Sequence, residues 1–77
     1  MPQYFFHVQD GEFLPDKVGY ECTDSDAARE HAVQRIRKLI SDGALEGIDR
    51  SHWTMIVADL SGQTVYSIPF AFALSRA

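Results

Sequence analysis

The sequence predicts an α+β fold of the order ββαββ, in which a β-hairpin, one amphipathic helix and a second β-hairpin follow one another. Aromatic and β-branched residues gather near both ends of the chain, as they do in strands. In residues 25–42, by contrast, the apolar residues recur at helical spacing. Asp10-Gly11 and Ser61-Gly62 mark turns inside the two hairpins. We therefore expect a four-stranded, mainly antiparallel sheet with the helix packed on one face.

The first hairpin starts with a strand over residues 3–9, which ends at the strong turn signal Asp10-Gly11. Alternate residues of a strand point to opposite faces. One face of this strand carries Tyr4, Phe6 and Val8, and the other carries Phe5, His7 and Gln9. Residues 13–16 continue as a loop, and residues 18–22 return as a short strand in which Gly19 weakens the pattern or marks a bulge.

The helix is expected to begin after Thr23 or Asp24, because either side chain can accept a hydrogen bond from a free backbone N–H of the first turn. The following residues, 25–42, have one apolar stripe, as in a helix that buries a single face. The stripe consists of Ala28, Ala32, Val33, Ile36, Leu39 and Ile40. Gly43 is a natural residue for the helix to end on.

The second hairpin consists of a strand over residues 53–60, a turn at residues 61–63 and a strand over residues 64–70. Pro69 has no N–H for the ladder, so it belongs at the end of its strand or on an edge. Between the helix and this hairpin, Leu45 and Ile48 are expected to lie beneath the edge of the sheet.

A single helix can cover only one face of a four-stranded sheet, so the opposite face is the main candidate for a functional surface. The third strand adds to it one of two largely apolar sets, either Trp53, Met55 and Val57 or Thr54, Ile56 and Ala58. A large exposed apolar patch usually marks an interaction site. We therefore expect a homo-oligomer, in the simplest case a dimer, or a complex with a protein partner; the alternative is that sheet twist and the C-terminal tail cover the face. The predicted interface residues are Phe5, His7, Trp53 and Met55.

Length and composition limit the classes of protein to consider. The 77 residues are expected to form one domain, 1–77, and the single cysteine, Cys22, excludes an intrachain disulfide and favours a reducing compartment. The chain has no signal-like N-terminus and no run of about 20 apolar residues, so we expect a cytoplasmic protein without a membrane span. The formal net charge of −4 argues against nucleic acid as the main partner.

Residues that carry chemistry are few and widely spaced. His7, Cys22, His31 and His52 lack the spacing of a metal site, so we expect neither a metal ion nor another cofactor. No histidine is placed beside Cys22, or beside a serine and an acid, in the way that a catalytic nucleophile needs. We therefore predict no catalytic residue and a protein that is not an enzyme, with Cys22 as a small buried thiol.

The helix carries one basic stripe, formed by His31, Arg35 and Lys38, because residues three or four apart share a helix face. These residues are the candidate contacts for an anion or a nucleic-acid backbone. They give the alternative function, that of a regulatory or antitoxin-like module associated with nucleic acid. A solvated helix face, on which Asp42 pairs with Lys38, is the plainer interpretation.

Several of these residues occur in an order and spacing that resemble a known family. They are Tyr4-Phe5-Phe6-His7-Val8, Asp10-Gly11, Gly19, Asp24 with Ala27-Ala28, Asp59 with Gly62, and Ile68-Pro69-Phe70. The family contains very small bacterial proteins, common in soil and plant-associated alphaproteobacteria, and is catalogued as a domain of unknown function. The resemblance covers nearly the whole chain and implies a stand-alone cytoplasmic domain without an assigned activity; Cys22 stands where the family more often has an aliphatic residue, which argues against a redox role. A weaker likeness, limited to strands before an acid-capped helix, is to antitoxins with a partial RNase H-like fold.

Overall fold

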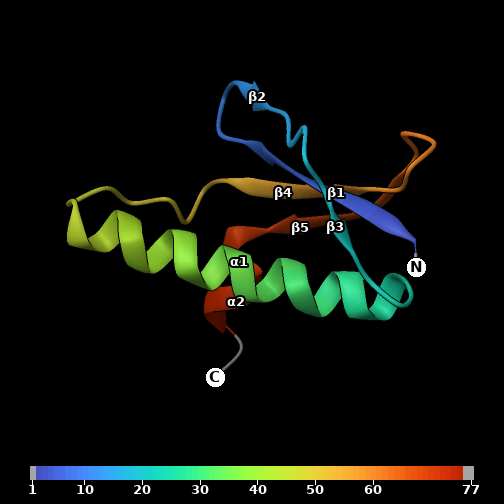
Figure 1. The fold of residues 1–77 in the computed structure, drawn as a ribbon. Coiled ribbons are helices and arrows are strands. Elements are labelled where there is room, and N and C mark those ends of the chain that lie inside the picture. The colour runs from blue at the N-terminus through green and yellow to red at the C-terminus, as the bar shows by residue number, and fades with distance from the viewer. Residues whose placement is uncertain (1, 76–77) are drawn as a thin grey trace.

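A five-stranded antiparallel sheet with one long helix along one of its faces makes up the fold (Figure 1). The structure is a computed structural model and describes residues 2–75. Its elements are β1 (Gln3–Gln9), β2 (Phe13–Leu14), β3 (Tyr20–Glu21), α1 (Ser25–Leu45), β4 (Thr54–Ala58), β5 (Thr64–Pro69) and α2 (Phe70–Ser75). The predicted α+β class is confirmed, with one strand more than expected. Among the described helices, none combines the length and apolarity that crossing a membrane requires.

β1 lies at the centre of the sheet. One of its edges pairs with β4, and β5 continues the sheet beyond β4. Its other edge is shared by two short strands, since β2 pairs with the C-terminal part of β1 and β3 with the N-terminal part. The prediction of a loop at residues 13–16 is therefore wrong for Phe13 and Leu14. The Asp10-Gly11 turn is tight enough to bring Phe13 back opposite Gln9.

Asp16 fills the gap between β2 and β3. Its carboxylate accepts hydrogen bonds from the backbone N–H groups of Phe6 (3.1 Å), Val18 (3.0 Å) and Gly19 (3.1 Å). Its own backbone N–H donates to Nδ1 of His7 at 2.9 Å. Because Phe6 lies between the residues that pair with β2 and β3, its N–H has no strand partner on that edge, and the carboxylate takes the place of one.

The core lies between the sheet and α1. The apolar stripe of α1 faces it as predicted, and the fully buried alanines of this stripe allow the helix to approach the strands closely. The sheet contributes Tyr4, Phe6, Met55, Val57 and Ile68, and α2 adds Phe70 and Ala73. Cys22 is also buried, which confirms its interpretation as a buried thiol. Burial, together with the nearby charge of Asp24, raises the pKa of this thiol.

The start of α1 agrees with the prediction, and its end does not. The Asp24 carboxylate caps the helix by accepting from the N–H of Ala27 at 2.8 Å. The helix continues past Gly43, because the following turn supplies a Schellman motif: the N–H groups of Gly47 and Ile48 bond back to carbonyls of the last turn. Gly47 has the positive φ, +74°, that this motif requires.

Gly43 instead lies inside the helix and allows the chain that follows the helix, at Ile48 and Arg50, to pack closely against it. A Cβ at this position would lie 2.9 Å from the backbone oxygen of Ile48 and 2.9 Å from Cδ of Arg50. Leu45 and Ile48 do not lie beneath the sheet edge as expected, since both are exposed, Leu45 by 86%. Both residues follow Gly43, the last buried residue of α1, and lie where the chain turns back towards β4 (Figure 1).

Candidate functional site

The face of the sheet opposite α1, here called the outer face, has no described helix or strand packed over it (Figure 1). Directly opposite residues of paired strands share a face. The registers therefore place on it Phe5, His7 and Gln9 of β1, Phe13 of β2, Thr54, Ile56 and Ala58 of β4, and Ser67 and Pro69 of β5. None of these residues carries a formal charge; Glu21, opposite Gln3, is charged but lies at a corner. The shortest extent of the molecule, 17 Å, fits one helix layer on one sheet layer.

The pairing of β4 with β1 decides which of the two predicted residue sets faces outward. Ile56 lies opposite His7, so the set Thr54, Ile56 and Ala58 is on the outer face. Met55 is 0% exposed and belongs to the core. Trp53 packs on the same covered side, with its ring 5.8 Å from that of Phe70. The predicted interface is corrected accordingly: Phe5 and His7 lie on the outer face, whereas Trp53 and Met55 do not.

Three aromatic rings form a row across the outer face. The rings of Phe5 and His7 are nearly parallel, at 6°, with centroids 6.4 Å apart. Phe13, which the sequence analysis had placed in a loop, continues the row 5.1 Å from His7 and is 50% exposed. Because Nδ1 of His7 accepts the N–H of Asp16, the neutral imidazole carries its proton on Nε2. The loop at Gly19 touches Phe5 and shields part of the row.

The predicted basic stripe lies along a shallow groove between α1 and β3, here called the Tyr20 groove, with a volume of about 430 Å³. It is lined by Tyr20, His31, Arg35, Lys38 and Leu39. His31 is not a solvated cation there, because its ring stacks on Tyr20 (4.1 Å, 3°) and meets the edge of Phe6 at 4.9 Å. Burial, reinforced by the charge of Arg35, lowers the pKa of His31 below its usual 6.5. Arg35 and Lys38 are thus the cations that the stripe presents at neutral pH.

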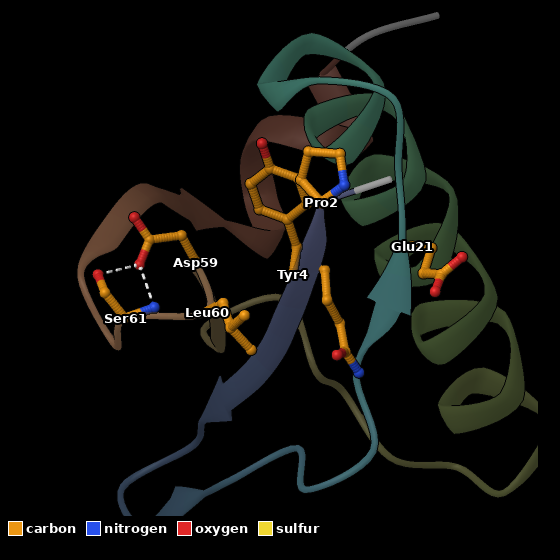
Figure 2. Close-up of a pocket in the computed structure, with 7 residues that line it drawn as sticks. Pro2, Tyr4, Glu21, Asp59, Leu60 and Ser61 are labelled. Atoms are coloured by element: carbon orange, nitrogen blue, oxygen red, sulfur yellow. Dashed lines mark hydrogen bonds between the residues drawn. The ribbon is translucent and has the colours of Figure 1, made fainter.

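A second hollow, of about 410 Å³, lies at the start of β1 beside the turn between β4 and β5 (Figure 2). It contains two carboxylates, and Figure 2 shows Glu21 and Asp59 on opposite sides of β1, so they do not converge. Asp59 serves its own turn, since its carboxylate accepts from the hydroxyl of Ser61 at 2.6 Å and from the N–H groups of Ser61 and Gln63 at 3.0 Å. These bonds hold the pKa of Asp59 below its usual value. The hollow therefore lacks the paired acids that general acid–base chemistry uses.

The other candidate chemical groups lie in separate environments. His7 faces outward, His31 lies beneath Tyr20, and Cys22 is in the core. Within residues 2–75, no three histidine, cysteine or acidic side chains lie close enough together to hold a metal ion. His7 contacts the backbone N–H of Asp16, and the carboxylate of Asp16 is engaged by three other N–H groups. The histidines and the cysteine named as candidates from the sequence thus do not converge on one site in the described part of the chain.

Sequence reasoning missed three residues that shape these surfaces: Phe13, Asp16 and Tyr20. Each acts through a partner on another element, namely His7, Phe6 and His31. Asp16 had a partial local signal, because an aspartate three residues before a glycine is typical of a turn in which its carboxylate accepts backbone N–H groups. Phe13 and Tyr20 had no such signal, since their ring partners are brought near only by the sheet.

A protein-family model matches residues 3–71, and its description is a domain of unknown function (DUF6894). The match includes all five strands, α1 and the start of α2. No curated protein and no solved structure matches the chain. The comparisons therefore assign the chain no activity.

Proposed function

Because this chain belongs to DUF6894, a family of domains of unknown function, we propose a function from its own geometry. It is a small non-enzymatic module that binds a second copy of itself, or a protein partner, through the outer face. The observation that carries this proposal is the absence of charged side chains among the described residues at the centre of that face. In the chain as a whole, 23% of the residues are charged.

Charge depletion distinguishes the core of an interface from ordinary protein surface. On the outer face the row Phe5, His7 and Phe13 lies beside Ile56 and Ala58, and the other neighbouring positions on β1 and β4 are neutral polar residues. Two copies of a chain with a net charge of −4 repel one another at long range. A contact through the neutral face leaves the acidic side chains of α1 outside the contact, where water and salt screen them.

The size of the outer face places the proposed contact among the small interfaces, which are mostly weak or transient. The sheet is four strand positions wide and seven residues long at β1. At about 4.8 Å per strand and 3.3 Å per residue, it covers roughly 400 Å² per subunit. Two such faces would bury roughly 800–1,000 Å², which is at the small end of specific interfaces. We therefore expect association in the micromolar range.

Both edges of the sheet are poorly suited to pairing with another strand, which favours the outer face as the site of association. The N–H of Phe70 donates to the carbonyl of Trp53 at 2.8 Å, which sets the alternation of the ladder between β4 and β5. In this alternation the backbone nitrogen of residue 69 points away from β4, towards the free edge of the sheet. Because Pro69 has no N–H, it cannot donate a hydrogen bond to another strand at that edge. A bulge near Val57 disturbs the other end of β5, and β2 and β3 have only two residues each.

The alternative, a module associated with nucleic acid, has less support. It relied on three basic residues, and His31 is stacked beneath Tyr20 with a lowered pKa. Two cations in an acidic chain would give weak binding with a shallow dependence on salt.

Sedimentation velocity over a range from about 10 μM to 1 mM tests the proposed self-association, because these concentrations bracket a Kd of about 100 μM. Ser67→Asp places a charge on the outer face at an exposed residue of β5, where little of the core is disturbed. We expect it to raise the Kd at least tenfold, by burying an unpaired charge. Leu45→Asp is the matched control, since it adds the same charge at an exposed apolar residue of α1.

The expected result is a dimer for the unchanged chain and for Leu45→Asp, and a monomer for Ser67→Asp. Phe5→Asp should also weaken association, but it additionally alters the contact between Phe5 and Gly19. A monomer at the highest concentration would refute self-association. Equal effects of Ser67→Asp and Leu45→Asp would show that the outer face is not the contact.

A further inference from the structure

The Tyr20 groove places two cationic side chains beside a partly exposed aromatic ring. Tyr20 is 52% exposed, although one side of its ring is stacked on His31. Half-buried Leu39 adds an apolar wall, and Arg35 and Lys38 line the groove one helical turn apart. The volume of about 430 Å³ is within the range of small-molecule sites.

Within residues 2–75, no carboxylate forms a salt bridge with Arg35 or Lys38. The salt bridge found among the described residues joins Arg50 to Glu46, and the pairing of Lys38 with Asp42 suggested by their spacing does not form. Arg35 does influence Asp16, whose pKa it helps to lower, but that carboxylate is already bound by three backbone N–H groups. The guanidinium of Arg35 lies 5.8 Å from the centre of the Phe6 ring, which holds it at the groove.

We propose that the Tyr20 groove binds a small organic anion with a planar apolar group. The planar group lies against Tyr20 and Leu39, and the carboxylate or phosphate of the ligand lies between Arg35 and Lys38. Ring stacking suits the exposed tyrosine, and the guanidinium fork suits a two-oxygen anion. The neutral state of His31 fits this arrangement, because an uncharged ring supports Tyr20 without adding a third cation.

Acidic residues beside the groove limit the size of the anion. On the other side of the Tyr20–His31 stack, a neighbouring hollow is lined by Glu21 and Glu30. The positive surface is therefore confined to one side of the stack. A nucleic-acid strand carries phosphates at regular intervals and would meet these carboxylates, whereas a molecule with a single anionic group would not.

Titration of the ¹⁵N-labelled protein with phenyl phosphate, followed by NMR, tests the proposal. Inorganic phosphate and phenol, each representing one half of this probe, serve as comparison ligands. We expect phenyl phosphate to shift the amide signals of Tyr20, Arg35 and Lys38 and to bind at least about fivefold more tightly than either half. Arg35→Gln and Lys38→Gln should each weaken it about fivefold. Arg37→Gln makes the same charge change on α1 outside the groove and should leave binding unchanged.

Tyr20→Leu separates the two parts of the site, because it should remove the advantage of phenyl phosphate over inorganic phosphate. The two glutamine substitutions are at exposed positions, so they test the site even if Tyr20→Leu unfolds the domain. The proposal is overturned if phenyl phosphate causes no shifts at about 10 mM, or if Arg37→Gln weakens it as much as Arg35→Gln does. Tighter binding of a single-stranded oligonucleotide, weakened by the same variants, would overturn it in favour of a nucleic-acid site.

Discussion

Replacing Asp16 by alanine is expected to destabilise the domain, because one carboxylate completes the edge of β1. The substitution removes the acceptor for the N–H groups of Phe6, Val18 and Gly19. The N–H of Phe6 is the most costly of these to leave unpaired, since it is partly buried between β2 and β3. The loop between these strands would also lose the contacts that hold it against β1.

The magnitude follows from the three hydrogen bonds. A net contribution of about 0.5–1.5 kcal/mol per bond, taken at the lower end because Asp16 is partly exposed, gives a loss of about 2 kcal/mol for Asp16→Ala. For a domain of this size, such a loss lowers Tm by roughly 8–16 °C. Asp16→Asn keeps one oxygen for Val18 and Gly19 but turns an NH₂ towards the N–H of Phe6. We therefore expect about half of the loss for asparagine.

The dependence on pH gives a second, independent test. Burial raises the pKa of Asp16, but the bonds from Phe6, Gly19 and Val18 and the charge of Arg35 together lower it below 3.8. Because the folded pKa is lower than the unfolded one, the stabilisation is fully present above about pH 3.8 and is lost as the pH falls through the folded pKa. The difference in stability between the unchanged chain and Asp16→Asn should therefore shrink below about pH 3.8.

Urea unfolding followed by circular dichroism measures both effects, and comparison with Asp16→Asn cancels the contributions of Asp49 and Asp59, whose pKa values are also lowered. Lys17→Ala, in the same loop but without a side-chain role in these bonds, is the control. A Tm for Asp16→Ala within about 2 °C of the unchanged chain would refute the reasoning, since three lost bonds cannot cost so little. An Asp16→Asn variant as stable as the unchanged chain would show that the bond to Phe6 is not the dominant one.

Two further predictions concern α1. His31→Phe keeps an aromatic ring beneath Tyr20 but cannot be protonated. Since the folded pKa of His31 lies below 6.5, the unchanged chain should lose stability as the pH falls below about 6.5. Thermal melting between about pH 7.5 and 5 should show a smaller loss of stability for the variant. An identical slope in both proteins would contradict the buried position of His31. A glycine-to-alanine substitution stabilises an ordinary helix by about 1 kcal/mol. Gly43→Ala should instead destabilise the domain, because the added Cβ would lie 2.9 Å from the backbone oxygen of Ile48. Ser41→Ala, at an exposed position of the same helix, is the control. A higher Tm for Gly43→Ala than for the unchanged chain would contradict this packing argument.

The surfaces could be predicted from the sequence only in part. The outward position of Phe5 and His7 followed from strand alternation, once the other face of their strand was assumed to meet the helix. The choice between Met55 and Ile56 could not be made, because both alternating sets of that strand are apolar and a one-residue shift exchanges the two faces. The register between β1 and β4, which is a long-range property, buries Met55 and turns the half-buried Ile56 to the outer face.

The sequence by itself determined the features whose signals lie within a few residues of one another. The Asp24 cap, the tight Asp10-Gly11 turn and the alternation of residues 3–9 belong to this class, because local hydrogen bonds and steric preferences act over that range. Tertiary structure decided the features that need a distant partner. Asp16 completes the sheet only because β2 and β3 both pair with β1 and leave Phe6 between them. No described helix covers the outer face, because α1 packs along the opposite side.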